Sequence, residues 1–404
     1  MKHFISFIAL FVVLTFNPAF AQGEAAIPFL YVTPSSQFTG LGWTGVSVPN
    51  DDAFGFHYNP AMIGYFGQRN NLSIQMYPGE TDWIFGINVN SYALNAGYNF
   101  KNELNGLNLS GGAGFIRNRF SFGPENYDSY NAYVFGVGID YYITLSAGIT
   151  FKNIHSQISR FISPEETAIA RADANAIDYG FLLSLPILDL FDNTSIEFFD
   201  SRIIPDFDYS IGYSRLNIGD EVYYFDPDQF DPLPLTARLG HTISLGLDYQ
   251  TDNILINMLD YDLILEADDI LVSREFDPET LQFGDIKYDG MLGEIDFFDN
   301  LIRLKSNDNV VIHKGHSIRF VETVTILSGS FSGRGYERGI KTNGLIISSL
   351  GFFKWLGAIS GDNILRFIAN HIELRYVSSS IFEGESIETD LSGLSLSFFN
   401  YSFN

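Results

Sequence analysis

The chain of 404 residues contains no cysteine, which excludes disulfide bonds, cysteine-based zinc sites and thiol catalysis. Basic residues are scarce: 23 Lys and Arg stand against 48 Asp and Glu, for a net charge of −25. This balance excludes a large nucleic-acid surface, because phosphate binding needs clustered cations. Beyond residue 21 no apolar run is long enough for a membrane-spanning helix, since residues 180–190 are interrupted by Pro186 and Asp189.

Aromatic residues, by contrast, are abundant. They make up 16% of the chain, with 38 Phe and 22 Tyr, whereas charged residues make up only 18%. A disordered chain would show the opposite balance, with few aromatics and many charges. The composition therefore indicates a folded protein.

The first 21 residues are expected to form a cleaved secretory signal peptide. Lys2 supplies a short basic start, residues 4–16 are almost purely apolar, and Ala19-Phe20-Ala21 matches a small-residue cleavage site. An N-terminal membrane anchor is the alternative, but the apolar run is shorter than the roughly 20 residues that a helix needs to cross a bilayer. Export leaves two classes of protein open: a secreted soluble β-protein and an outer-membrane β-barrel.

Alternation of apolar and polar residues with a period of two is the main structural signal. It predicts β-strands with one apolar face. Leu72, Ile74 and Met76, for example, alternate with a serine and a glutamine. The same pattern recurs at residues 83–89, 92–100, 107–115, 133–139, 143–151, 236–250, 372–376 and 391–398.

Periodicity alone does not say whether the apolar faces cover a protein core or touch lipid. Three features favour lipid. Strands of about ten residues suit a tilted bilayer crossing, the polar faces are rich in Gly, Asn and Ser, and Phe100, Tyr130 and Tyr141 lie at strand ends. We therefore expect an all-β, transmembrane, antiparallel outer-membrane barrel of about 14 strands over residues 71–404. A secreted β-sandwich or propeller is the alternative.

One helix and one closing strand are expected within this region. Ser163, Pro164 and the two acids that follow form a helix-start pattern, which predicts a short loop helix to about residue 176. Residues 391–403 predict the closing strand, with Leu394, Leu396 and Phe398 on one face.

Residues 22–70 lack the alternation and form a separate pre-barrel segment. Asn59-Pro60 starts a turn, because proline fixes its own φ and pushes the preceding residue into an extended conformation. Gly40 and Gly42 allow close backbone contact. From these residues alone an ordinary turn and short strand is the simpler interpretation, and a plug folded back into the barrel lumen is the alternative.

The order of motifs in this segment resembles the opening of the PorV/PorQ family of outer-membrane barrels, of the wider FadL-like type. The chain has, in this order, an apolar start (Phe29 and Leu30), a small-residue segment (Gly40 and Gly42), an acidic step (Asp52) and an NPA turn (residues 59–61). The residues that carry the resemblance are Phe29, Leu30, Gly40, Gly42, Asp52, Asn59, Pro60 and Ala61. The chain departs from the family pattern at Trp43, at Pro49 and in an acidic insert around residues 260–299.

The resemblance implies a plug-like N-terminal segment and a part in type IX secretion, in which the barrel engages exported proteins and helps deliver them to the cell surface. It implies an outer-membrane location, with the lipid bilayer, secretion-system components and exported cargo proteins as partners. The alternative function is a FadL-like channel for hydrophobic small molecules. The Asn-, Ser- and Gly-rich faces disfavour this channel, because they offer little apolar surface to such a ligand.

The residues suggest neither catalysis nor a cofactor, and we expect a non-enzymatic protein. No G-x-S-x-G nucleophile elbow is present. His313 and His316 are three residues apart, which places them on opposite faces of a strand. His241 lies on the apolar face of a strand, where an aromatic-like role at a membrane interface is expected. Structural calcium on the acidic loops is an alternative to simple solvation of clusters such as residues 226–231, 260–269 and 294–299.

Overall fold

The computed structural model describes residues 25–70, 72–76, 81–83, 87–101, 107–123, 125–163, 166–191, 195–199, 201–224, 230–251, 254–274, 276–277, 282–382 and 388–400. The expected signal peptide, residues 1–21, lies outside these residues. The end of the expected closing strand after residue 400 lies outside them as well.

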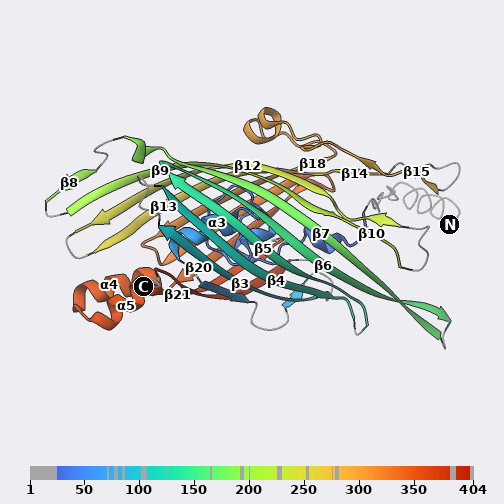
Figure 1. The fold of residues 1–404 in the computed structure, drawn as a ribbon, viewed down its shortest axis with the longest axis horizontal. Helices are drawn as coiled ribbons and strands as arrows, with labels where there is room; N and C mark the ends of the chain where they lie inside the picture. Colours follow the sequence, from blue (N-terminus) through green and yellow to red (C-terminus); the bar gives the residue numbers. More distant parts are fainter. Residues whose placement is uncertain are drawn as a thin grey trace, which may run out of the picture.

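Fourteen antiparallel strands of the described chain form one closed barrel (Figure 1). Closure runs through β1, which pairs on one side with β22 and on the other with β3. The expected all-β barrel of about 14 strands is confirmed. The barrel strands are β1 (Leu72–Met76), β3 (Ile87–Lys101), β4 (Asn108–Ser121), β5 (Tyr127–Tyr141), β6 (Ile143–Ser163), β7 (Glu166–Pro186), β9 (Ser201–Gly219), β12 (Thr236–Gln250), β13 (Leu255–Ile270), β18 (Val310–Phe320), β19 (Val324–Gly333), β20 (Tyr336–Ser348), β21 (Ile372–Ile381) and β22 (Thr389–Phe398).

Shorter strands extend the wall or form small hairpins in its connections. Two of them pair with barrel strands, β2 with β3 and β8 with β9. The short strands are β2 (Thr81–Trp83), β8 (Ile196–Phe198), β10 (Glu221–Val222) with β11 (Asp231–Pro232), β14 (Val272–Ser273) with β17 (Lys287–Tyr288), and β15 (Phe276–Asp277) with β16 (Gln282–Phe283).

The two ends of the barrel differ. At one, which we call the terminal end, β1 begins at Leu72 opposite Phe398, the last residue of β22. A 3-10 turn, η5 (Leu188–Leu190), and a helical hairpin lie at this end, in the connections from β7 and from β20. At the other, which we call the insert end, residues 271–309 connect β13 to β18.

The alternation of residues sets the two faces of the wall. Along β1, Leu72, Ile74 and Met76 are exposed, whereas Ser73 and Gln75 are buried. The outward apolar side chains form a belt on other strands too, and its members include Tyr133, Phe135, Val137, Ile139, Leu245, Leu247, Ile326, Leu345, Ile347, Leu374 and Tyr376. Polar and small residues face inward, as the alternation predicts. An exposed apolar belt of this kind is what a membrane-spanning barrel turns toward lipid.

The prediction of a helix after Ser163 is wrong. Residues 166–176 belong to β7, which pairs along its length with β6. The reason is the alternation of small and larger residues: Ala170, Ala172, Ala174 and Ala176 are buried on the inward face. Alanine has high helix propensity, but strand pairing and the need for small side chains inside the barrel override it.

The N-terminal segment, residues 25–70, lies inside the barrel (Figure 1). It is a chain of short helical turns whose hydrogen bonds reach strands all round the wall, from β4 to β21. The simpler interpretation, an ordinary turn and short strand, is therefore wrong. Its elements are η1 (Pro28–Tyr31), α2 (Ser36–Gly40), η2 (Gly55–His57), α3 (Met62–Phe66) and η3 (Gly67–Arg69).

The connection at the insert end folds back over the outside of the wall. Its π-helix η6 (Phe297–Ile302) packs against His241, whose ring lies 6.0 Å from that of Phe297. Leu301 is fully buried in an apolar cluster with Ala237 and Ala267 of the wall. His241 is thus covered by protein rather than placed at a membrane interface, so the role expected for it is corrected.

The boundary expected for the acidic insert is also corrected. Asp260, Asp262, Glu266 and Asp268 belong to β13, not to a solvated loop. They occupy alternate positions on the inward face, with Glu266 fully buried. The irregular part of the insert begins only after residue 270.

Two helices at the terminal end, α4 (Leu350–Ser360) and α5 (Asn363–His371), connect β20 to β21. Asp362 caps α5, because its side chain accepts hydrogen bonds from the backbone N–H groups of Ile364 and Leu365. None of the helices in the described chain has the length and apolar character needed to cross a membrane.

Candidate functional site: the occupied barrel interior

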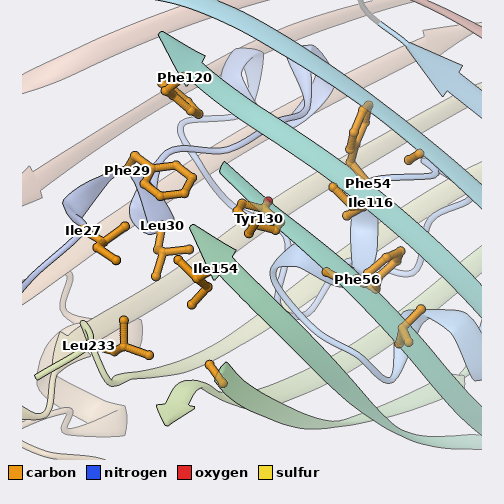
Figure 2. Packing of buried hydrophobic residues seen from close by; sticks show 14 of the residues in the cluster. Ile27, Phe29, Leu30, Phe54, Phe56, Ile116, Phe120, Tyr130, Ile154 and Leu233 are labelled. Atoms are coloured by element: carbon orange, nitrogen blue, oxygen red, sulfur yellow. The ribbon is translucent and has the colours of Figure 1, made fainter. Parts of the chain in front are cut away.

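The apolar start of the N-terminal segment packs into a cluster near the insert end of the lumen (Figure 2). The Phe29 ring stacks on Tyr130, with centroids 5.8 Å apart, and lies 5.3 Å from the ring of Phe120. Leu30 is buried beside it. The wall supplies inward-facing Ile116 and Ile154 to the same cluster. The two apolar motif residues therefore anchor the segment by burial of apolar surface.

The small-residue motif lets the backbone of the segment lie directly against strands β19 and β20 of the wall. Thr342 of β20 donates a hydrogen bond to the Gly40 carbonyl over 3.0 Å. Gly42 has a φ of +72° and lies against β19, where a Cβ would meet the Ser330 nitrogen at 2.5 Å. Only glycine satisfies both the left-handed conformation and this close approach. The spacing of glycines in the sequence thus has a packing cause.

The NPA turn docks on β6 and β7. Asn59 Nδ2 donates to the carbonyls of Val46 and Phe181, over 2.7 and 3.0 Å, and its Oδ1 accepts from the Ala61 N–H over 3.0 Å. The side chain is fully buried and uses both of its polar atoms. Pro60 then starts the turn into α3, as its fixed φ favours.

Glycines of the wall make room for this turn. A Cβ on Gly148 would lie 2.1 Å from the Pro60 carbonyl oxygen, a backbone atom that cannot rotate away. We expect Gly148→Ala to destabilise the folded barrel by about 1–3 kcal/mol, because overpacking forces backbone shifts. Gly111→Ala is the matched control, since its nearest neighbour would be a side-chain atom of Phe100 at 3.3 Å. Urea unfolding of both variants in detergent checks this; equal stabilities would contradict it.

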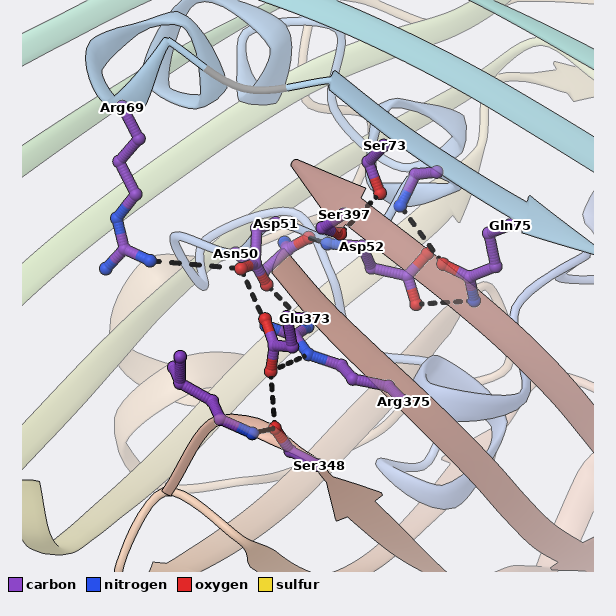
Figure 3. A network of polar contacts seen from close by, with 12 residues as sticks. Asn50, Asp51, Asp52, Arg69, Ser73, Gln75, Ser348, Glu373, Arg375 and Ser397 are labelled. Atoms are coloured by element: carbon purple, nitrogen blue, oxygen red, sulfur yellow. Dashed lines mark hydrogen bonds and ion pairs between the residues drawn. The ribbon is translucent and has the colours of Figure 1, made fainter. Parts of the chain in front are cut away.

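The acidic step holds the segment to β21 (Figure 3). Asp51 forms a bidentate pair with Arg375, with both N–O distances 2.6 Å. Arg375 also contacts Glu373, which accepts a hydrogen bond from Ser348. Burial alone would raise the pKa of Asp51, but the Arg375 guanidinium outweighs it and holds that pKa well below its usual range. The motif acid Asp52 lies beside this pair.

Asp52 organises the segment itself. Its carboxylate accepts hydrogen bonds from the Ser35 hydroxyl over 2.8 Å and from the Phe54 N–H over 2.7 Å. Gln75 of β1 donates to it over 3.3 Å. Burial raises the pKa of Asp52. Neighbouring acids therefore take different roles, Asp51 as an ionic anchor to the wall and Asp52 as an acceptor for local turns.

Stability should depend on pH through the Asp51–Arg375 pair. A carboxyl whose pKa is lowered on folding stabilises the native state above its unfolded pKa, here 3.8, and loses that contribution as pH falls through the folded pKa. Arg375→Ala leaves buried carboxylates unpaired and should cost about 3–5 kcal/mol at pH 7. In the variant the lowering effect of Arg375 is gone and burial raises the pKa of Asp51, so acid protonates Asp51 above pH 3.8 and the deficit shrinks. Unfolding curves at pH 7 and pH 4 measure it.

Arg69→Ala is the control for this pair. Its guanidinium lies 3.9 Å from Asp51, but its side chain is 66% exposed, against 14% for Arg375. Exposed ion pairs contribute little, so we expect a loss below about 1 kcal/mol. A pH-independent deficit for Arg375→Ala, or an equal deficit for Arg69→Ala, would contradict the assigned role.

Glu266 of the wall contacts the segment through four hydrogen bonds. Its carboxylate accepts hydrogen bonds from the backbone N–H groups of Gly45, Val46 and Ser47, over 2.8, 2.8 and 3.0 Å, and from the Ser47 hydroxyl over 3.0 Å. Successive N–H groups around an anion form a nest, which is a strong charge-assisted arrangement. The fully buried acid thus fixes the bend of the segment.

A second polar anchor involves His313 of β18. Its Nδ1 lies 2.8 Å from the Gly42 carbonyl and its Nε2 lies 2.7 Å from Asp268. Arg238 of β12 pairs with the same acid over 3.2 Å and donates to the Trp43 carbonyl over 2.7 Å. The histidine is therefore a structural link. His316, three residues further along β18, contacts Tyr261 of β13 instead, as expected for a residue on the opposite face of the strand.

A cavity of about 810 Å³ lies between the segment and the hairpin of α4 and α5. Charged side chains of both signs line it, including those of Asp206, Asp260, Asp262, Arg69, Arg319 and Lys354. Arg319 and Asp260, opposite each other on the neighbouring strands β18 and β13, form an ion pair in this lining. Such a lining suits water and polar solutes, because an apolar ligand would leave these groups desolvated without partners.

The interior shows no catalytic arrangement in the part of the chain that the structure describes. Its histidines contact carbonyls, acids or rings, and no group of three His, Asp or Glu among the described residues could hold a metal ion. The motif residues are instead brought together as anchors of one segment. Sequence reasoning missed Glu266, Arg238 and Arg375. The alternate-position acids of β13 were a usable signal for an inward polar face.

Comparisons with known proteins give barrels of low similarity. No family model matches the chain, and no curated protein matches it. The toluene transporter TbuX of Ralstonia pickettii is 10% identical, with 91% of this chain and 98% of that chain covered and a TM-score of 0.42. A Pseudomonas aeruginosa FadL homologue is 10% identical, with 91% of this chain and 98% of that chain covered and a TM-score of 0.36. The translocator domain of the autotransporter NalP from Neisseria meningitidis is 10% identical, with 82% of this chain and 88% of that chain covered and a TM-score of 0.35. Similarity at this level does not bear on function.

Proposed function

We propose that the chain is a non-enzymatic barrel of the bacterial outer membrane whose lumen is closed by its N-terminal segment. The outward apolar belt supports the membrane assignment, because charged or polar side chains would otherwise be expected there. Cleavage after Ala21 would leave residues 22–70 as the plug and residues 71–404 as the barrel. The terminal end would face the periplasm, and the long connection at the insert end would face outward, as in other barrels of this class.

We further propose a part in type IX secretion, as the PorV/PorQ resemblance implies. The observation that carries this proposal is the way the motif residues are used: Gly42, Asp52 and Asn59 anchor a segment that lies in the lumen. A barrel filled in this way suits work through its outer surfaces, namely the engagement and delivery of exported proteins. Its partners would be secretion-system components and cargo.

A channel for hydrophobic small molecules is the second candidate. The observation that favours it is a break in the wall, where the pairing of β7 with β9 shifts between Ile177 and Tyr179 and Asn217 adopts a φ of +60°. The buried Lys152–Asp178 ion pair, 2.8 Å long, fills this position with charge. Together with the polar cavity it argues against an apolar path.

A deletion strain separates the two functions. Loss of a secretion component should leave cargo proteins trapped in the periplasm or released without attachment, while uptake of hydrophobic solutes stays unchanged. Cell-surface proteolysis and blotting of cargo measure the first, and growth on a hydrophobic carbon source the second. Cargo that stays on the surface in the deletion strain would overturn the secretion proposal. Loss of uptake alone would favour the channel.

A further inference from the structure

The hairpin of α4 and α5 is fixed to the rim of the barrel by one of its sides. Lys354 pairs with Glu322 of the β18–β19 turn over 2.6 Å. Arg366 of α5 donates to the Gly357 carbonyl of α4 over 3.2 Å, and Gly357 packs against the Arg366 side chain. Ala369 is buried, and Ala358 lines the polar cavity. The hairpin is therefore held in a defined orientation.

The other side of the hairpin is apolar and exposed. Phe352, Trp355 and Ile359 follow one another at intervals of three and four residues, which places them on one face of α4. Ile364 and Phe367 do the same on α5. Each of the five side chains is more than half exposed. A soluble surface rarely gathers this many large apolar side chains without a partner.

This face adjoins the apolar belt of the barrel. The exposed Ile347 of β20 lies three residues before α4 begins, and the exposed Leu374 of β21 lies three residues after α5 ends. Figure 1 shows the hairpin at the mouth of the barrel, beside the ends of β20 and β21. The apolar face is thus continuous with the surface assigned to lipid. Aromatic residues, tryptophan above all, favour the boundary between lipid and water.

We propose that α4 and α5 lie in the membrane leaflet at the terminal end, with this apolar face among the lipid headgroups and upper acyl chains. Amphipathic helices bind membranes in this way, with the apolar side submerged and the polar side toward water. The hairpin then fixes the depth of the barrel and seals its rim against the bilayer. This inference goes beyond the secretion role and depends only on the barrel being in a membrane.

Trp355, 54% exposed, is a natural reporter of depth. The full chain and Trp355→Phe are reconstituted in phosphatidylcholine vesicles, and the difference between their emission spectra isolates this tryptophan. The lipids carry bromine either near the headgroup end or near the methyl end of the acyl chain. We expect roughly twofold quenching by the shallow bromine and weaker quenching by the deep one. Phe135→Trp in the Trp355→Phe background should show the reverse order, because Phe135, 55% exposed, lies in the middle of β5.

The other outcomes overturn the proposal in distinguishable ways. Trp355 open to iodide and unaffected by either bromine would place the hairpin in water. Protection from both iodide and bromine would mean that a second copy or another protein covers it. Absence of quenching for Phe135→Trp as well would remove the membrane assignment itself. Should Trp355→Phe fold poorly, Trp355→Tyr supplies both the difference spectrum and the background for a second reporter one helical turn away, Ile359→Trp.

Discussion

A chain that lacks residues 25–66 is expected to conduct ions in planar bilayers roughly tenfold or more better than the full chain, because removal of the lumen's contents leaves a wide closed wall around water. The full chain should stay nearly silent. The removed residues supply the apolar contacts of Phe29 and the polar contacts of Asn59 that fill the interior. Single-channel recordings of both proteins give the comparison.

Folding of the shortened barrel must be established alongside conductance. Circular dichroism and the heat-sensitive mobility of the barrel in gels report whether the wall has closed. A folded barrel without residues 25–66 that conducts no better than the full chain would contradict the role of the segment as a plug. Addition of the segment as a separate peptide should restore closure.

Loss of the Glu266 carboxylate is the single substitution expected to loosen the segment most. Glu266→Ala leaves three backbone N–H groups without an acceptor inside the barrel, which should cost about 3 kcal/mol or more. The effect should be local. Hydrogen exchange of residues 45–47 should rise sharply, while amides of the wall strands stay protected.

Two further variants calibrate this effect. Glu266→Gln keeps one acceptor oxygen but presents an NH2 group toward the Gly45 N–H, so an intermediate loss is expected. Glu197→Ala removes an exposed acid of β8 and should change little. Unchanged exchange at residues 45–47 in Glu266→Ala would show that the nest does not hold the segment.

The existence of the strands, and the face to which each side chain points, could be predicted from the local sequence, because successive residues of a strand point to opposite faces. The same rule explains the failure at residues 166–176. Ala170, Ala172 and Ala174 carry little hydrophobic contrast with the residues between them, so a helix-start pattern at Ser163 dominated the interpretation. Their small size is instead what the crowded inward face selects, as their burial shows.

The anchors on the segment were predictable and their partners were not. Asn59 and Gly42 are recognisable because turns and close approaches restrict residue type locally. Glu266 meets residues 45–47 across some 220 positions of sequence, and Arg375 meets Asp51 across 324. Such pairs depend on strand order and register, which single residues do not encode. The acids at alternate positions of β13 do indicate which face of the strand is turned inward, but they do not indicate which residues of the N-terminal segment they contact.

The central claim is that the outward belt touches lipid while the other face encloses an interior that holds the N-terminal segment. The absence of cysteine from the chain makes single-cysteine labelling clean. Phe135→Cys and Leu345→Cys place a thiol on the belt, and Tyr223→Cys places one in an exposed connection at the insert end. In vesicles, a membrane-impermeant maleimide should label the belt thiols at least roughly tenfold more slowly than the connection thiol, because a hydrocarbon layer covers them. Equal labelling rates at all three positions would contradict the account.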